Sequence, residues 1–187
     1  MKEIEILVEV QEDINSVLSC LDKFVKKGMK ITKDIYYFDP LRNNLRPDSN
    51  GKLRECCRLR EKAGKYYITY KIDNYNGNVW VYSDEYETEV KDIDILKRIL
   101  EKLGLQELVI VNNKKHTFET LEYEIVVEDV EGLGVFLEVE YIGNSEKTSV
   151  DEIKKRIIQF IKDLNLKVGD ELNSGKPELL LKKANKL

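Results

Sequence analysis

Cysteine, proline, tryptophan and histidine are scarce in this chain of 187 residues, which contains three, three, one and one of them. The three cysteines lack the Cys and His spacing of zinc sites, so they exclude a disulfide scaffold and a zinc module and suit a reducing compartment. Glycine and proline together make up about 7% of the chain, too little for a low-complexity or disordered protein. No apolar run approaches the roughly 18 residues of a membrane span, and residues 1–5 do not resemble a secretory signal. We therefore expect a cytoplasmic protein with no membrane partner, folded as a single domain over residues 1–187.

Neither sign of charge dominates the composition. There are 31 Lys and Arg residues against 35 Asp and Glu residues, a net charge of −4. This balance argues against a protein that coats nucleic acid, because such proteins need an excess of positive charge. Hydrophobic residues form 42% of the chain, enough to bury a core.

Hydrophobic periodicity predicts about eight strands and three substantial helices. Segment 3–10 alternates between mostly acidic and apolar residues, which is typical of a strand with one polar face. Further strands are predicted at residues 31–38, 53–62, 66–73, 79–90, 107–119, 122–130 and 135–142. Helices are predicted from Asp13 to Gly28, from Asp92 to Gly104, over 149–164 and, as a short last helix, from Pro177 to about 185. Because hairpins join most of the strands, the predicted class is α+β with an antiparallel sheet.

The second face of most predicted strands is charged. Alternate positions hold Arg54, Arg58, Arg60 and Lys62, then Thr69 and Lys71, then Glu85, Glu87 and Glu89, then Lys115, Glu124, Glu128, Glu138 and Glu140. One interpretation is an open sheet whose charged face lies in water. The other is a closed sheet whose charged residues line a polar interior. There, a divalent cation between the carboxylates and a polyanion against the Arg and Lys side chains would offset the repulsion within each group.

Several short motifs, taken in order along the chain, resemble one family. Glu3-Ile4-Glu5 resembles an ExExK signature, Cys57-Arg58-Leu59-Arg60 resembles an L-R-I-R strand, and Thr69-Tyr70-Lys71 resembles a T-Y-K motif. The acidic run 84–90 is similar to the family's central strand, and segment 124–140 is similar to the class IV adenylyl cyclase segment D-E-V-E-G-L-G-x-F-L-E-I-E. The family is the CYTH family, or triphosphate tunnel metalloenzymes. It includes class IV adenylyl cyclases, thiamine triphosphatases and inorganic tripolyphosphatases.

The resemblance implies an eight-stranded antiparallel closed β-barrel with amphipathic helices packed outside, whose lumen binds a triphosphate with Mg²⁺ or Mn²⁺. The core motifs would cover residues 3–140, followed by C-terminal helices within 149–185. The implied metal ligands are Glu3, Glu5, Glu138 and Glu140. The implied phosphate ligands are Arg58, Arg60, Lys71 and Lys115, with Lys114 as the alternative to Lys115. The residues implied in catalysis are Lys71, Glu87 and Glu128.

Two positions depart from the family pattern. Leu7 stands where ExExK has its lysine, and Asn113 stands where a basic residue is expected. We therefore expect Leu7→Lys to restore a cation and raise turnover.

The functions that follow are a cyclase that converts ATP to cyclic AMP and pyrophosphate, a hydrolase of inorganic tripolyphosphate or thiamine triphosphate, and a non-catalytic module that binds a nucleotide or polyphosphate. A fourth, binding of RNA 5′-triphosphate ends, is weakened by the acidic net charge. The expected partner is a small-molecule triphosphate, with a homodimer as a further alternative.

Overall fold

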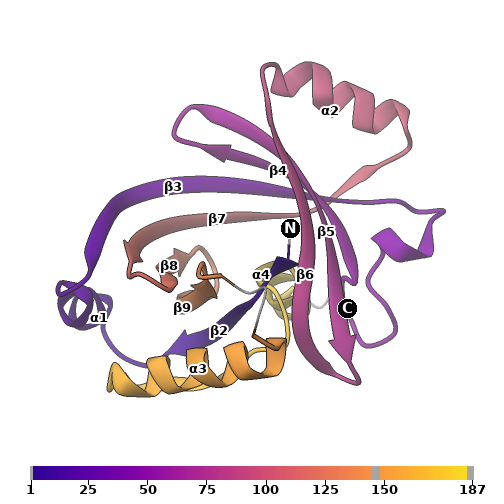
Figure 1. Cartoon of the computed structure of the whole chain (residues 1–187). Coiled ribbons are helices and arrows are strands. Elements are labelled where there is room, and N and C mark those ends of the chain that lie inside the picture. The colour runs from indigo at the N-terminus through magenta and orange to yellow at the C-terminus, as the bar shows by residue number, and fades with distance from the viewer. Residues whose placement is uncertain (1, 145–147, 185–187) are drawn as a thin grey trace.

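A single antiparallel sheet forms the body of the protein. The computed structural model describes residues 2–144 and 148–184. Its strands are β1 (Lys2–Glu3), β2 (Glu5–Val10), β3 (Val25–Phe38), β4 (Glu55–Lys62), β5 (Lys65–Asn76), β6 (Val79–Val90), β7 (Gln106–Glu119), β8 (Tyr123–Val130), β9 (Gly134–Tyr141) and β10 (Val168–Glu171). Their order across the sheet is β1-β6-β5-β4-β3-β7-β8-β9-β2-β10. The sheet is strongly curled into a half-barrel, so that β3 and β7 arch over β8, β9 and β2 (Figure 1).

The N-terminal segment contacts two distant parts of this sheet. β1 pairs with β6 through Glu3 opposite Ser83, whereas β2 pairs with β9 through Glu5 opposite Glu140. Only Ile4 separates the two ladders, and its carbonyl accepts a hydrogen bond of 2.9 Å from the backbone N–H of Tyr141. Residues 2–10 therefore connect β6 and β9, which lie toward opposite sides of the strand order.

Four helices lie within the described part of the chain. They are α1 (Ile14–Leu21), α2 (Ile93–Lys102), α3 (Val150–Asp163) and α4 (Lys176–Lys183). Side-chain oxygens of Asp13, Asp92 and Ser149 cap the first three by accepting backbone N–H bonds. In Figure 1, α3 runs along the outside next to β2, α2 projects from the far end of β6, and α4 lies behind the hollow of the half-barrel. None of these helices is both long and apolar enough to span a bilayer.

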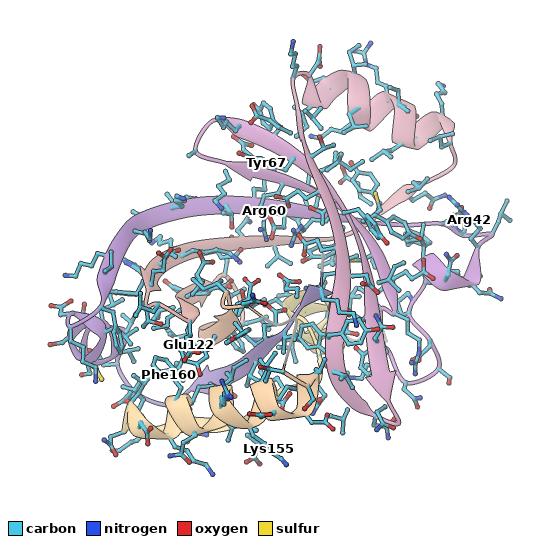
Figure 2. The ribbon with its side chains drawn as sticks, in the orientation of Figure 1. Arg42, Arg60, Tyr67, Glu122, Lys155 and Phe160 are labelled. Atoms are coloured by element: carbon cyan, nitrogen blue, oxygen red, sulfur yellow. The ribbon has the colours of Figure 1, made fainter. Side chains whose placement is uncertain are left out.

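Three apolar clusters hold the elements together. The largest lies between the sheet and the outer helices α1 and α3, where Phe160 of α3 packs on Tyr123 with ring centroids 4.6 Å apart. The opposite side of α3 carries exposed residues such as Lys155 (Figure 2). A second cluster lies under α2 around Leu100. The third joins Leu7 to Leu179 and Leu180 of α4, so this helix closes one end of the half-barrel with apolar contacts.

The predicted α+β class, the antiparallel sheet and the position of most elements are confirmed. The strand count is wrong, because the N-terminal strand divides at Ile4 and residues 168–171 add an unexpected edge strand, which gives ten described strands rather than eight. The structure shows a half-barrel, so the closed barrel implied by the resemblance stays a proposal.

Two predicted helix boundaries also differ from the structure. The helix after Asp13 ends at Leu21, well short of Gly28, which lies inside β3 at an irregularity of its pairing with β7. The last helix ends at Lys183, and residue 185 lies outside the described residues.

Candidate functional site

The hollow of the half-barrel is a pocket lined by the charged faces of the strands. It occupies about 840 Å³, part of which is open to solvent. Its charged and amide lining residues are Glu3, Glu5, Asp34, Arg58, Arg60, Lys71, Asp73, Glu85, Asn113, Lys115, Glu138, Lys176 and Glu178. Much of the alternating charge in the sequence therefore lines a confined polar interior, whereas Arg54, Glu87 and Glu89 of the same pattern are exposed.

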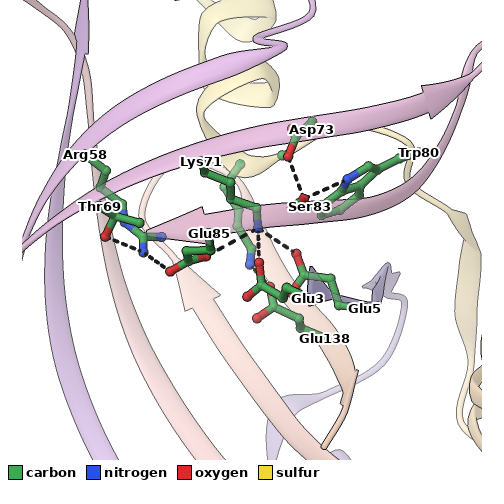
Figure 3. Close-up of polar contacts among 12 residues, drawn as sticks. Glu3, Glu5, Arg58, Thr69, Lys71, Asp73, Trp80, Ser83, Glu85 and Glu138 are labelled. Carbon is green, nitrogen blue, oxygen red and sulfur yellow. Dashed lines mark hydrogen bonds and ion pairs between the residues drawn. The ribbon is translucent and has the colours of Figure 1, made fainter. Parts of the chain in front are cut away.

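Lys71 of β5 lies at the centre of the acidic part of this pocket. Its Nζ is 2.5 Å from Oε2 of Glu3 and 3.2 Å from Oε1 of Glu5 (Figure 3). Burial alone would lower the pKa of Lys71, but these two carboxylates outweigh burial and raise the pKa well above its ordinary value. Lys71 is thus held as a cation between carboxylates that come from the N-terminal strand.

The carboxylates around Lys71 repel one another. Burial, followed by the charges of Glu138 and Glu3, raises the pKa of Glu5 well above its usual range. Glu140 lies opposite Glu5 in the β2–β9 ladder, and burial together with Glu3 and Glu138 raises its pKa to about 8. Such shifts show that the cluster is short of positive charge, which is the situation that a divalent cation relieves.

Two arginines of β4 form the next part of the lining. Nη2 of Arg58 donates to Oγ1 of Thr69 at 3.0 Å and lies 3.3 Å from carboxylate oxygens of both Glu85 and Glu87. Nε of Arg58 is buried and has no hydrogen-bond partner within the described residues. A buried N–H without a partner costs free energy, so this atom is a ready donor for an anionic ligand.

Arg60 is bonded more completely than Arg58. Its Nε and Nη2 each donate to Asp34 at 2.7 Å, in the two-pronged geometry typical of an arginine and a carboxylate. Burial would raise the pKa of Asp34, but Arg60 outweighs burial and holds the pKa below its ordinary value. Any anion that approached Arg60 would therefore have to share this guanidinium with Asp34 or displace it.

On β7, Lys115 faces the pocket while Lys114 is exposed on the outer face. Nζ of Lys115 lies 3.0 Å from Oε1 of Glu128, a side chain with 0% exposure. Nδ2 of Asn113 donates to the other oxygen of Glu128 at 2.7 Å. Burial opposes ionisation of Glu128, but Lys115 and Lys176 outweigh burial and keep its pKa well below the usual range.

Lys176 is the cation that sequence reasoning missed. It is the first residue of α4, and its Nζ lies 2.8 Å from Oε1 of Glu128 and also pairs with Glu138. These carboxylates raise its pKa against the effect of burial. In residue order Lys176 is far from every motif of the resemblance, and the local sequence indicates only a helix opened by Pro177.

Most of the predicted site residues come together in this pocket. Those that line it are Glu3, Glu5, Arg58, Arg60, Lys71, Lys115 and Glu138. Glu140 is adjacent through its pairing with Glu5. Glu87 lies at a more exposed position, where it bonds Arg58 and Thr69, and Glu128 is buried behind Lys115.

Beyond Lys176, the sequence analysis also passed over acidic residues of the lining. Asp34 occupies an alternate position of β3, and Asp73 accepts a 2.7 Å bond from Oγ of Ser83, which in turn accepts one from the indole N–H of Trp80 (Figure 3). Both could have been predicted, because side chains alternate between the two faces of a strand and these strands follow the same alternation.

The donor chemistry of the pocket fits a hard divalent cation. Carboxylate oxygens are the ligands that Mg²⁺ and Mn²⁺ prefer, and the raised pKa values of Glu5 and Glu140 show that several converge. Among the residues that the structure describes, however, no three Asp, Glu, His or Cys side chains are already arranged as metal ligands. Instead, Lys71 is paired with Glu3, and Lys176 is paired with Glu138.

A comparison with protein-family models decides what kind of protein this is. The CYTH domain model matches residues 1–174 of the chain. The chain belongs to the CYTH family. The matched range includes every strand that the structure describes in this CYTH protein and ends before α4, so Lys176 lies outside it.

Individual relatives of the CYTH protein agree with this assignment. It is 29% identical to "Putative adenylate cyclase MJ0240" of Methanocaldococcus jannaschii, over 96% of this chain and 98% of that protein. The structure of PH1819 from Pyrococcus horikoshii superposes with a TM-score of 0.80 at 24% identity, over 97% and 99% of the two chains. "Putative adenylyl cyclase HpAC1" from Hippeastrum, described with a dominant triphosphatase activity, has a TM-score of 0.66 at 15% identity, over 99% and 97%. The two structures share the fold of this protein.

Proposed function

We propose that this CYTH protein is a metal-dependent enzyme that hydrolyses a triphosphate bound in the hollow of the half-barrel. The observation that carries the proposal is the division of one confined pocket into a basic and an acidic part. Arg58, Arg60 and Lys115 line the basic part. Glu3, Glu5 and Glu138 line the acidic part, and Lys71 lies among these carboxylates. A polyanion and a divalent cation bound together would neutralise both parts at once.

The basic residues would hold the phosphate oxygens. Arg58 has an unpartnered Nε and, like Arg60, presents the planar group that matches phosphate. Lys71 and Lys115 would exchange part of their bonding to carboxylates for bonds to phosphate. Glu87 and Glu128 would then act by positioning Arg58 and Lys115, which they already contact.

Glu3, Glu5, Glu138 and Glu140 would hold the Mg²⁺ or Mn²⁺. When bound, such an ion supplies Lewis-acid polarisation of phosphate oxygens and activation of water. The surrounding residues keep the triphosphate extended and its charge offset, so that the terminal phosphorus can be attacked in line. Cys56 also lines the pocket, but burial raises its pKa to about 12, so a thiolate is not available there as a nucleophile.

The proposal includes closure of the half-barrel into a tunnel. Support comes from residues 2–10, which pair with β6 through β1 and with β9 through β2. Since Glu3 and Glu5 belong to this segment, closure would hold the acidic part of the pocket next to Lys71.

Cyclisation of ATP is the second candidate. It is favoured by segment 124–140, by the name of the Methanocaldococcus jannaschii relative and by Tyr67, a half-buried residue opposite Arg60 where a base could stack. Hydrolysis is preferred because the aromatic residues that line the pocket itself, Tyr36 and Trp80, are both buried and leave little ring surface for a base.

The test is to incubate the protein with tripolyphosphate, thiamine triphosphate and ATP, each with Mg²⁺ or Mn²⁺, and to identify the products by ion chromatography. Orthophosphate is the expected product, and its release should require the metal. The double variant Glu138→Gln/Glu140→Gln should lower kcat/KM by about 10²–10³, as expected when preorganised charge at the reacting group is lost.

Glu9→Gln is the matched control, because Glu9 lies on β2 but is exposed outside the pocket. Its activity should equal that of the wild type. Cyclic AMP and pyrophosphate from ATP would assign the second candidate instead. Undiminished metal-dependent turnover in the Glu138/Glu140 variant would remove the assignment of the acidic part, and binding without any product would show a non-catalytic module.

A further inference from the structure

Just beyond the pocket lining, at the end farther from α4 (here the open end), lie two lysines that the proposed triphosphate site does not use. Lys62 is the last residue of β4, two positions beyond Arg60, and Lys30 lies on β3 directly opposite Lys115 of β7. Side chains two apart in a strand share a face, so both lysines belong to the face that lines the pocket. They continue its basic part outward by roughly 6.6 Å, the rise of two strand residues.

These lysines lack carboxylate partners. Within residues 2–144 and 148–184, neither Lys30 nor Lys62 forms an ion pair, whereas the neighbouring Arg60 and Lys115 are paired with Asp34 and Glu128. Burial, together with Lys30, Arg60 and Lys115, lowers the pKa of Lys62, and Glu124 offsets only part of this. The two lysines therefore repel each other in a half-buried place where one further anion would be stabilised.

An unpartnered hydroxyl lies between them. Thr32 of β3 is opposite Lys62 on one side and opposite Asn113 on the other. It is 1% exposed, and its Oγ1 has no hydrogen-bond partner within the described residues. Because Thr32 shares its face with Asp34 of the pocket lining, this hydroxyl is available as a donor to an anionic oxygen at the same place.

We propose that Lys30, Thr32 and Lys62 form an additional phosphate subsite, and that the preferred substrates are linear inorganic polyphosphates of four or more phosphates. The inference rests on the proposed function, because the pocket must hold the first three phosphates. A neutral nucleoside at this end would leave the repulsion between the two lysines in place. A further phosphate of the same chain would offset that repulsion and would accept a hydrogen bond from the Thr32 hydroxyl.

The test is calorimetric titration with tripolyphosphate and linear tetraphosphate in EDTA, where turnover is absent. Wild-type protein should bind tetraphosphate about 10-fold more tightly than tripolyphosphate, since a bond to a charged group contributes on this scale. In Lys30→Met/Lys62→Met the ratio should fall to about 1, with the affinity for tripolyphosphate changed by less than about 3-fold. Thr32→Val, which keeps the shape and removes the hydroxyl, should lower the ratio by about 3-fold.

Lys33→Met/Lys91→Met is the matched control, because it removes the same charge from exposed positions. It should keep the wild-type ratio. Equal affinity of the wild type for the two polyphosphates, or a preference that survives in the Lys30/Lys62 variant, would overturn the subsite. The subsite would also be overturned if added orthophosphate raised the affinity for tripolyphosphate. The lysines would then bind a separate anion and not a fourth phosphate of the same chain.

Failure of the proposed function looks different. Protein that binds neither polyphosphate in EDTA, and also produces no orthophosphate with Mg²⁺ or Mn²⁺, would remove the triphosphate site itself. Hydrolysis of tripolyphosphate without preference for the longer chain would keep that site and remove only the subsite.

Discussion

Both ends of the pocket have lysines, but only at one end are these lysines paired with carboxylates of the protein. At the end closed by α4, Lys71 and Lys176 are bonded to carboxylates, and their pKa values are raised. At the open end, Lys62 has no such partner within the described residues, and its pKa is lowered. The lysines of the closed end are thus already bonded to carboxylates, so an anion that binds them must exchange existing bonds. Lys62 at the open end has no such bond to exchange within the described residues, so an anion there would meet an unpaired cation.

The largest effect on this comparison is expected from Leu7→Lys. Leu7 is 2% exposed and packs with α4, so the substitution removes apolar contacts and adds a cation where Lys176 already lies. We expect it to lower the free energy of unfolding by about 4 kcal/mol, measured by urea denaturation. The expectation from sequence alone that a lysine at this position raises turnover stays a prediction, and an assay of the same variant with tripolyphosphate measures it.

Lys176→Met should have the next largest effect. It leaves Glu138 without its cation and Glu128 with Lys115 and Asn113 only, so we expect a loss of about 3 kcal/mol by urea denaturation. Lys182→Met, on the exposed side of the same helix, is the control and should be neutral.

Combining Leu7→Lys with Lys176→Met sharpens the comparison further. Leu7 is opposite Glu138 in the β2–β9 ladder, so a lysine there can take over the pairing that Lys176 provides. The double variant should be more stable than the sum of the two losses by at least about 1 kcal/mol. Strict additivity would show that the two positions do not serve the same carboxylate.

The smallest effect concerns the open end and appears as a dependence on pH. Because the pKa of Lys62 is lower in the folded protein than its ordinary 10.5, the unfolded chain binds more protons between these two values. The Lys62 contribution to stability should then rise with pH through this interval. Urea midpoints of the wild type and Lys62→Met, measured from pH 7 to 10.5, should differ less at the alkaline end. A constant difference would contradict the unpaired state of Lys62.

Local patterns in the sequence were enough for most of the sheet and for the basic and acidic parts of the pocket. Period two placed Arg58, Arg60 and Lys71 on one face, and that face lines the pocket. Side-chain caps located the start of α1 and α2, because capping is a local interaction.

The remaining features depend on contacts between residues far apart in the chain. Lys176 meets Glu128 and Glu138 only after α4 has packed on Leu7, and nothing in residues 175–183 indicates that contact. By the motif alone, Leu7 is the loss of a cation. In the structure, Leu7 instead packs against the helix that places a cation in the pocket. The early end of α1 likewise follows from the pairing of Val25 with β7, which draws these residues into the sheet.

The split N-terminal strand has a consequence for synthesis of the chain. Residues 2–10 are synthesised before all of these partners, because the partners in β6, β9 and β10 appear only after about residues 84, 140 and 171. Long-range strand pairing of this kind is slow, because a large loop must close before any contact compensates for it. This early segment is therefore among the last to pair, and a nascent chain stalled before β9 would display an unpaired, partly apolar edge that invites association with other chains.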